Sequence, residues 1–369
     1  MIPVNTPLLA GREAEYLLEC IEGGWISSEG PFVRRFEREF AAKVGRSDGV
    51  AVANGSCALD MAVLALDIGA DDEVIMPTFT IISCAAAVVR AGAKPVLVDC
   101  DPQTWNMTAE AIAAKITSKT KAIMVVHIYG LPVDMDPILE LAAKHNLRII
   151  EDAAEMHGQT YKGRPCGSFG DISTFSFYPN KHVTTGEGGM VLADDPKLLE
   201  RCRSLRNLCF NDQQRFVHHE LGWNYRMSNL QGAVGVAQLE QLDGFVERKR
   251  AIGARYQASL GDLDCFQTAP VETAYAKNIY WVYGLVVKPN APKTKNEIVS
   301  ELTKQGIGTR PFFWPMHRQP VFEKMGLFQN DHHPVAGHIG ENGFYLPSGL
   351  GLSDDDIDEV IGKLRACVE

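Results

Sequence analysis

A short turn between two apolar segments offers backbone amides and a hydroxyl group that could bind a phosphate. The segment Asn54-Gly55-Ser56-Cys57 follows an apolar run at 49–53 and opens a helical pattern at 56–66. The first amides of a helix have no acceptor within it, and the helix dipole adds partial positive charge there, so such a turn attracts anions. The same residues also suit an ordinary strand-to-helix turn with Ser56 as the helix cap.

A carboxylate ends the apolar run at 147–152. In open α/β sheets, ligands bind outside the carboxyl ends of the strands, which is where Asp152 is expected. A buried carboxylate needs a cationic or hydrogen-bond-donating partner to stay ionised, and a protonated heterocyclic nitrogen would serve. A structural helix cap is the other interpretation of Asp152.

A single lysine, Lys181, lies between the aromatic segment 173–178 and the glycine-rich segment 184–189. Most lysines are solvated surface charges, and this one could be another. Glycines allow the backbone to approach a ligand closely or to turn sharply, so a lysine between such a segment and aromatic residues is also a candidate for chemistry.

These three features are together the parts that would hold pyridoxal 5′-phosphate (PLP). The lysine would form a Schiff base with the cofactor, the aspartate would pair with the pyridinium nitrogen so that the ring accepts electrons, and the helix start would take the phosphate. Their order along the chain indicates this chemistry more strongly than any one of them.

The elements that position these residues follow the spacing of βαβ units. Apolar runs at 49–53, 73–76, 95–99, 122–127 and 148–152 alternate with helical patterns at 56–66, 82–91, 108–116 and 135–145. Continuous runs of Val, Ile and Ala are typical of strands buried on both faces. The pattern therefore predicts an α/β fold with a mostly parallel sheet flanked by helices.

The remaining chain predicts a second, smaller unit. β-rich pieces at 171–178 and 189–193 are followed by helices at 196–206 and 226–258, the second one long. Beyond this helix the βαβ spacing does not continue. The sequence there predicts a strand at 280–287, a helix at 295–305 and a closing helix at 353–366 that Ser353 would cap. We therefore divide the chain into a large domain over 1–245 and a small C-terminal α+β domain over 246–369.

Composition excludes several classes of protein. The chain has 369 residues, with 36 Lys+Arg against 46 Asp+Glu, a formal net charge of −10. Nucleic-acid binding is therefore disfavoured, because it needs a dense basic face. The absence of a GxGxxG after any expected strand disfavours a nucleotide-dependent dehydrogenase, and the absence of a Walker A motif an ATPase. Neither a signal peptide nor an apolar run near 18 residues is found, so a cytoplasmic protein without a membrane partner is expected.

Cysteines and histidines give little reason to expect a metal. Nine cysteines are spread singly, mostly within apolar runs and without a CxxC motif, so buried reduced thiols are expected. His332, His333 and His338 are clustered, but no cysteine or carboxylate stands at ligand spacing. A polar surface loop is the preferred interpretation, and no metal site is predicted.

Several motifs resemble, in sequence and in order, those of the DegT/DnrJ/EryC1/StrS sugar aminotransferases, and the resemblance covers essentially the whole chain. They are Asn54-Gly55-Ser56, Pro77-Thr78-Phe79-Thr80, Glu151-Asp152-Ala153-Ala154-Glu155, Gly170-Asp171 with Phe175-Ser176-Phe177, Asn180-Lys181 with Thr185-Gly186-Glu187-Gly188-Gly189, and Asn224-Tyr225-Arg226-Met227. The resemblance implies a fold-type-I (aspartate aminotransferase-like) PLP enzyme that acts as a homodimer with shared active sites.

The resemblance also implies roles for individual residues. Lys181 would carry the cofactor, Asp152 would hold its ring nitrogen, and Glu155 would lie near the ring hydroxyl. The phosphate site would consist of Gly55, Ser56, Cys57 and Ser176, joined by Asn224 of the neighbouring subunit. Ile81 stands where many relatives have an aromatic residue that stacks on the ring, so aliphatic packing would replace that stacking.

The resemblance implies amino transfer in two half-reactions, from L-glutamate to a keto sugar. A GDP- or dTDP-linked 4-keto-6-deoxyhexose, used for surface polysaccharide such as lipopolysaccharide O-antigen, is the preferred acceptor, and a sugar acid such as 8-oxo-Kdo is the alternative. Arginine suits phosphate or carboxylate, and the residues expected on the acceptor side are Trp25, Ser28, Arg226, Arg310 and His317. A PLP-dependent sugar dehydratase, in which histidine replaces the lysine, and a non-catalytic regulatory homologue are the less favoured alternatives.

Overall fold

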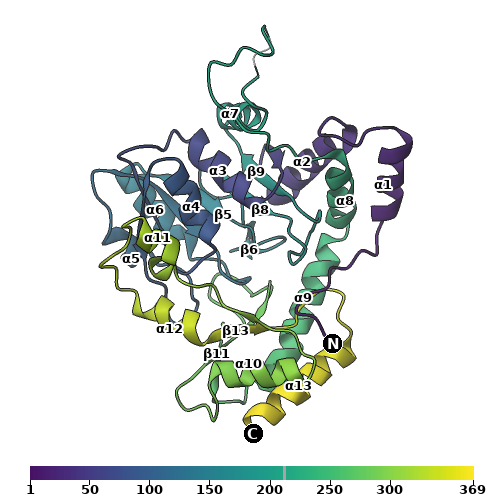
Figure 1. Cartoon of the computed structure of the whole chain (residues 1–369), viewed down its shortest axis with the longest axis vertical. Coiled ribbons are helices and arrows are strands. Elements are labelled where there is room, and N and C mark those ends of the chain that lie inside the picture. Colours follow the sequence, from purple (N-terminus) through teal and green to yellow (C-terminus); the bar gives the residue numbers. More distant parts are fainter. Residues whose placement is uncertain (211–212) are drawn as a thin grey trace.

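The large unit is built on a seven-stranded sheet, as seen in a computed structural model that describes residues 1–210 and 213–369 (Figure 1). Only β9 runs antiparallel to its neighbours in this sheet, so the predicted mostly parallel sheet is confirmed. In spatial order the strands are β1 (Asp48–Val52), β9 (Gly189–Ala193), β8 (Ile172–Ser176), β5 (Arg148–Asp152), β4 (Thr120–Val126), β2 (Glu73–Pro77) and β3 (Lys94–Val98).

Helices cover both faces of this sheet because successive strand residues point to opposite sides. Ile150 of β5, for example, packs into the core cluster on one face and Ile149 into the core cluster on the other. The first face carries α3 (Gly55–Ala65), α4 (Ile82–Arg90) and α7 (Pro196–Arg206). The second carries α2 (Pro31–Val44), α5 (Ala109–Ala113), α6 (Met135–His145) and α8 (Asn229–Leu239).

The small unit has its own antiparallel sheet and its own core (Figure 1). Its four strands, in spatial order, are β10 (Phe266–Thr268), β11 (Tyr283–Val287), β13 (Gly343–Leu346) and β12 (Arg310–Pro311). The helices that pack into its core are α9 (Leu242–Leu260), α10 (Lys295–Lys304) and α13 (Asp354–Val368). As predicted, Ser353 caps α13, because its side chain accepts a hydrogen bond from the amide of Asp356.

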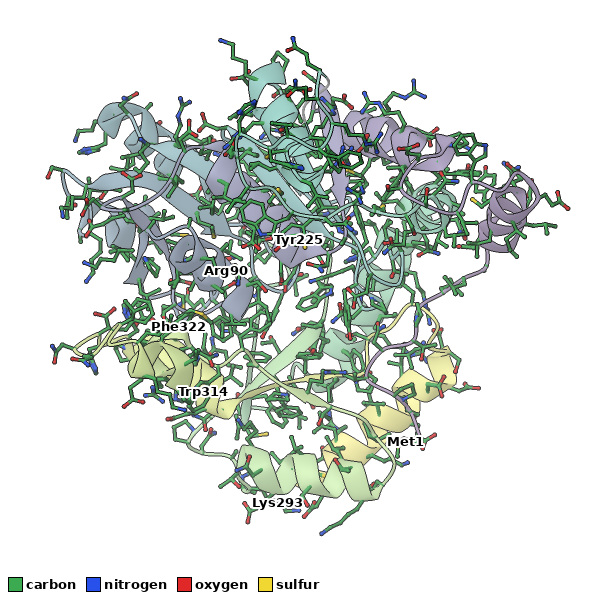
Figure 2. The ribbon with its side chains drawn as sticks, turned by 45° about the horizontal axis from the view of Figure 1, so that its top comes forward. Met1, Arg90, Tyr225, Lys293, Trp314 and Phe322 are labelled. Carbon is green, nitrogen blue, oxygen red and sulfur yellow. The ribbon has the colours of Figure 1, made fainter. Side chains whose placement is uncertain are left out.

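The start of the chain lies with the small unit rather than with the large sheet. Ile2 forms a parallel bridge with Ile307, and Figure 2 shows Met1 beside the yellow helix α13. The expected boundary at 245 falls inside α9, which contributes residues to the small core from Ile252 onward. The division into domains at 245 and 246 stays a prediction.

Other predicted elements differ in detail. The expected single helix over 226–258 is two helices, α8 and α9, with the break at Glu240 and Gln241. Both of these side chains make hydrogen bonds to α1 (Glu13–Glu22), a helix that the sequence patterns did not indicate. The remaining elements are the β6–β7 hairpin (Thr160–Tyr161 and Arg164–Pro165), the 3-10 helix η1 (Met316–Arg318), α11 (Pro320–Lys324) and α12 (Pro334–Asn342).

The nine cysteines are all free, and eight are buried, with Cys265 half-buried. Within the described ranges, no helix combines the length and the apolar character that crossing a bilayer requires.

Candidate active site

A cavity of about 650 Å³ lies at the carboxyl ends of β5 and β8, between the large sheet and the small unit. Its volume is in the range of small-molecule sites. Eight of the residues singled out in the sequence line it together: Gly55, Ser56, Ile81, Asp152, Glu155, Ser176, Lys181 and Arg310. The sheet topology explains this, since neighbouring parallel strands end at the same edge.

Asp152 is the last residue of β5 and is almost fully buried. One carboxylate oxygen accepts a hydrogen bond from the amide of Ala154 at 3.1 Å, and the other accepts one from the thiol of Cys84 at 3.2 Å. Burial raises the pKa of Asp152, since desolvation disfavours the charged form. A cationic group in the cavity would lower it again.

Lys181 lies in the turn between β8 and β9, with its amine inside the cavity. Its Nζ atom is 3.8 Å from the centre of the Trp281 ring and 3.7 Å from Oε1 of Glu155. Burial lowers the pKa of Lys181 and outweighs the opposing effect of Glu155 and Asp152. A lysine with a lowered pKa is more often neutral, which is the form that acts as a nucleophile or base.

Glu155 follows β5 and faces Lys181. Its Oε2 atom accepts a hydrogen bond from the amide of Tyr129 at 2.7 Å. Burial raises the pKa of Glu155 to about 8, and the nearby Lys181 opposes this rise. Glu155 can therefore hold or release a proton in the cavity near neutral pH.

The start of α3 forms another wall of the cavity. The helix cap is Asn54 and not Ser56, because the Asn54 side chain accepts a hydrogen bond from the amide of Cys57. This leaves the hydroxyl of Ser56, which lies 2.7 Å from that of Ser83, in the cavity wall. The side chain of Cys57 packs into the core instead.

Gly55 permits close contact between this helix start and the end of β8. A Cβ atom at Gly55 would lie 2.7 Å from the Cβ of Ser176, closer than two such atoms pack. The amides of the first helical turn and the Ser176 side chain therefore converge on the same part of the cavity.

The other predicted residues do not line the cavity as far as the described residues form it. Asn224 is exposed, and Arg226 donates a hydrogen bond to the side chain of Asn207. Trp25 is exposed and Ser28 half-buried in the loop after α1. His317 contacts Thr78 instead, with 2.8 Å between Nδ1 and Oγ1.

Two predicted residues stand at the opening of the cavity. Ile81 precedes α4 and is 44% exposed, so its aliphatic side chain forms part of the cavity surface. Arg310, in β12 of the small unit, is exposed as well. It also lines an adjoining chamber of about 150 Å³, which the N-terminal residues Val4 and Asn5 help to form.

The structure adds residues that the sequence patterns did not single out. Trp281 and Tyr345 reach the cavity from the small unit, some 100 positions or more after Lys181. Thr174 is a strand residue whose buried hydroxyl has no hydrogen-bond partner among the described residues. The aromatic run at 280–283 was the only sequence signal for Trp281, and aromatic runs more often belong to a core.

One buried group of side chains has the composition of a metal site. Ligand atoms of His127, Glu151 and Cys166 lie within 4.8 Å of one another. However, Nδ1 of His127 accepts a hydrogen bond from Val133, and its Nε2 lies 3.0 Å from Glu151, which accepts further bonds from backbone amides. Burial keeps the pKa of the Cys166 thiol high. Hydrogen bonding within the fold therefore accounts for this group.

The histidine cluster of the sequence is not entirely on the surface, so that expectation is corrected. His332 and His338 are exposed, but His333 is buried, with its ring 4.9 Å from that of His317. His333 directly precedes α12.

The cavity fits PLP by the chemistry of its walls. A helix start suits a phosphate, a buried carboxylate suits a protonated ring nitrogen, and a lysine with a lowered pKa suits an aldehyde. The partnerless hydroxyl of Thr174 is a further group that a ligand would satisfy.

Comparison with known proteins agrees with this chemistry. The sequence pattern of the DegT/DnrJ/EryC1/StrS aminotransferase family matches residues 7–365. The GDP-perosamine synthase of Caulobacter vibrioides is 42% identical over 363 residues, which cover 98% of this chain and 97% of that protein.

Solved structures give the same result. The aminotransferase TlmJ of Streptoalloteichus hindustanus superposes with a TM-score of 0.92 at 31% identity, over 100% of this chain and 98% of that one. The PLP form of the putative sugar aminotransferase Spr1654 of Streptococcus pneumoniae has the same fold, with a TM-score of 0.93 at 24% identity over 99% and 98% of the two chains. The predicted fold class and PLP as the cofactor are confirmed. The chain belongs to the DegT/DnrJ/EryC1/StrS aminotransferase family.

Proposed function

We propose that this aminotransferase moves an amino group from L-glutamate to a nucleotide-linked 4-keto-6-deoxyhexose. The observation that carries the proposal is the convergence of Lys181, Asp152 and the start of α3 in one cavity. The choice of sugar rests on the GDP-perosamine synthase that is 42% identical to the chain. The amino sugar would then enter surface polysaccharide such as lipopolysaccharide O-antigen.

In this proposal each residue has a distinct task. PLP supplies an aldehyde that receives the amino group and a ring that accepts electrons. Asp152 would hold the protonated ring nitrogen, and Gly55, Ser56 and Ser176 would bind the phosphate. Glu155 would lie near the ring hydroxyl, and Ile81 would pack against the ring.

Lys181 would also move the proton at the α-carbon of the amino donor. This task needs the neutral amine, and burial favours it by lowering the pKa of Lys181. Glu155, 3.7 Å away, could exchange a proton with it. The position of both groups deep in the cavity, on the large unit, leaves its mouth for the substrate.

The acceptor would enter past the small unit. Arg310 is a cation at the cavity opening, so it would bind a phosphate or a carboxylate of the substrate. His317 contacts Thr78 at the start of the loop that carries Ile81, so its influence on substrate would be indirect. Burial lowers the pKa of His317 to about 4, which keeps it neutral.

The substrate is tested by supplying the purified enzyme with L-glutamate and each candidate acceptor. GDP- and dTDP-linked 4-keto-6-deoxyhexoses and 8-oxo-Kdo are compared by the 2-oxoglutarate released and by the mass of the amino product. We expect turnover with a nucleotide-linked sugar. Turnover with 8-oxo-Kdo and with neither nucleotide would instead support the sugar-acid alternative and overturn the proposed substrate.

Gly55→Ala is expected to weaken PLP binding about tenfold while the protein stays folded. The new methyl group would lie 2.7 Å from Cβ of Ser176, and overpacking of this kind costs about 1–3 kcal/mol. Titration of cofactor-free protein with PLP, followed by absorbance, measures the change. Gly244→Ala is the matched control, because nothing lies within 4 Å of a Cβ atom there. Equal affinities of the two variants would contradict the phosphate role of this turn.

We further propose that two copies of the chain share their active sites. Asn224 and Trp25 are exposed, and large apolar side chains are also exposed on α1, in the loop after it, and after α7. These exposed side chains are Leu18, Ile21, Ile26, Phe216 and Leu221. A second copy that covers them would bring Asn224, and with it Arg226, toward the phosphate site of its partner.

Subunit mixing tests the sharing of sites. Lys181→Ala and Asn224→Ala proteins are each expected to be strongly impaired at limiting PLP. Co-expression in equal amounts should restore about a quarter of wild-type activity, since half of the dimers would be mixed and each would hold one intact site. Activity no higher than the mean of the two parent variants would show that Asn224 serves its own chain.

A further inference from the structure

A second buried lysine, Lys249, lies behind the candidate active site. It stands on α9, the helix that leads from the large unit into the small one, and is 2% exposed. Its Nζ atom donates hydrogen bonds to the backbone carbonyls of Trp281 and Ser348, each at 2.6 Å. Among the described residues it forms no ion pair with a carboxylate. A buried amine without a counter-ion is costly, so its retention calls for a specific reason.

The two carbonyls belong to separate segments of the small unit. Trp281 lies just before β11, and Ser348 just after β13. Burial lowers the pKa of Lys249 to about 7, and the positive charge of Lys181 adds to this effect. A neutral amine has two N–H groups, and the two carbonyls accept both. Lys249 therefore fixes the position of both segments relative to α9.

Trp281 connects this anchor to the reactive lysine. Its indole Nε1 donates a hydrogen bond to the carbonyl of Asn180 at 2.8 Å, directly before Lys181 in the chain. The face of the same ring lies 3.8 Å from Nζ of Lys181. Trp281 thus contacts both the backbone and the amine at this position, and it is itself buried.

We propose that Lys249 is a positioning residue that holds Trp281 against Lys181. The proposal rests on the proposed role of Lys181 as the reactive amine. An aromatic face stabilises the charged form of a lysine, most strongly where water is excluded. Loss of the anchor would release the indole, weaken this contact and displace the Lys181 amine.

The direction in which the pKa of Lys181 shifts when Lys249 is replaced distinguishes positioning through Trp281 from direct charge repulsion. Besides Trp281, the groups that interact with Lys181 are the carboxylates of Glu155 and Asp152, the thiol of Cys84, the buried imidazoles of His157 and His182, and Lys249 itself. If Lys249 acted only through its own charge, its removal would raise the pKa of Lys181. If it acts by holding Trp281, its removal lowers that pKa, by roughly half a pH unit.

The experiment measures the pKa of the Lys181 amine in the full-length protein without cofactor. Reductive methylation with formaldehyde and cyanoborohydride modifies only neutral amines, and peptide mass spectrometry reports the extent at Lys181 across a pH series. We expect the pH of half-maximal methylation at Lys181, the midpoint, to fall in Lys249→Met. The methionine side chain is similar in length to lysine but has no N–H groups. A rise or an unchanged midpoint would overturn the proposal. If Lys249→Met does not fold, Lys249→Gln is used instead. A smaller fall of the Lys181 midpoint is then expected, and a rise or an unchanged midpoint would again overturn the proposal.

Tyr256→Phe is the matched structural control. The Tyr256 hydroxyl, also on α9, donates a hydrogen bond to the carbonyl of Pro347, next to Ser348, but among the described residues it makes no hydrogen bond to Trp281. A general loosening of the small unit would shift the midpoint in Tyr256→Phe too, whereas positioning through Trp281 leaves it unchanged. A shift of equal size in this control would therefore contradict the proposal.

A double-mutant cycle tests whether Lys249 affects Lys181 through Trp281. In a Trp281→Leu background, Lys249→Met should have almost no further effect on the Lys181 midpoint, because the ring that it positions is gone. Additive effects of the two changes would overturn the proposal. Since no cofactor or substrate is used, this result is independent of whether the proposed amino transfer is correct.

Discussion

Lys181→Ala is expected to lower kcat by about 10⁴-fold or more and to abolish covalent attachment of PLP. The variant loses the amine that would bind the cofactor and move the substrate proton, and proton transfer alone contributes about 10²–10⁴-fold. Steady-state assay with the accepted keto sugar measures the rate. Borohydride reduction followed by peptide mass spectrometry measures the covalent attachment of PLP. In the wild-type protein it should locate the cofactor at Lys181.

Two variants control for loss of charge and for general damage. Lys181→Arg keeps a cation near Trp281, but a guanidinium stays protonated and cannot act as the neutral amine, so it should be as inactive as the alanine variant. Lys94→Ala removes a largely exposed lysine far along the sheet edge and should behave as wild type. Activity of Lys181→Ala within tenfold of wild type, or attachment at another lysine, would disprove the assignment.

Asp152→Asn is expected to lower kcat about 10²–10³-fold and to weaken PLP binding. The change keeps the shape of the side chain but removes the negative charge that would hold a protonated ring nitrogen, and such preorganised electrostatic contacts contribute about 3–4 kcal/mol. The Ala154 amide and the Cys84 thiol both donate to the carboxylate, so one donor would face the new amide NH₂ group. Kinetics and a PLP titration measure the two effects.

Asp243→Asn is the matched control for this prediction. Asp243 is exposed, and its ion pair with Lys43 lies on the surface, so both rate and cofactor affinity should stay near wild type. A kcat of Asp152→Asn within threefold of wild type would mean that the carboxylate serves only as a structural cap after β5, the alternative that the sequence left open.

Patterns of short range were sufficient to predict most of the large unit. The strands at 73–77, 94–98, 120–126 and 148–152 each contain an uninterrupted apolar run, as burial on both faces of a parallel sheet favours. The break between α8 and α9 was missed because its cause is tertiary. Both residues at the break make hydrogen bonds to α1, more than 200 positions earlier in the chain.

The candidate site divides in the same way. Gly55, Asp152 and Lys181 lie at ends of elements whose periodicity is visible, so topology alone predicts that they meet. Trp281 and Tyr345 come from the small unit, and no local pattern relates them to Lys181. The expected acceptor residues Trp25, Ser28 and Arg226 do not line the cavity of the described chain, and a role for them depends on the proposed second copy.

The amino-acid sequence by itself determined the α/β class and the family, and it singled out Lys181 and Asp152 as candidates for the site, because these inferences depend on residue types and spacing along the chain. Only the tertiary structure decided which cap α3 uses, which indole lies against Lys181, and that the buried amine of Lys249 donates a hydrogen bond to the backbone carbonyl of the same tryptophan. The physical reason is that pKa values and side-chain positions depend on burial and on neighbours in space. For Lys181 those neighbours include a tryptophan 100 residues later in the chain, whose backbone carbonyl accepts a hydrogen bond from a lysine on α9.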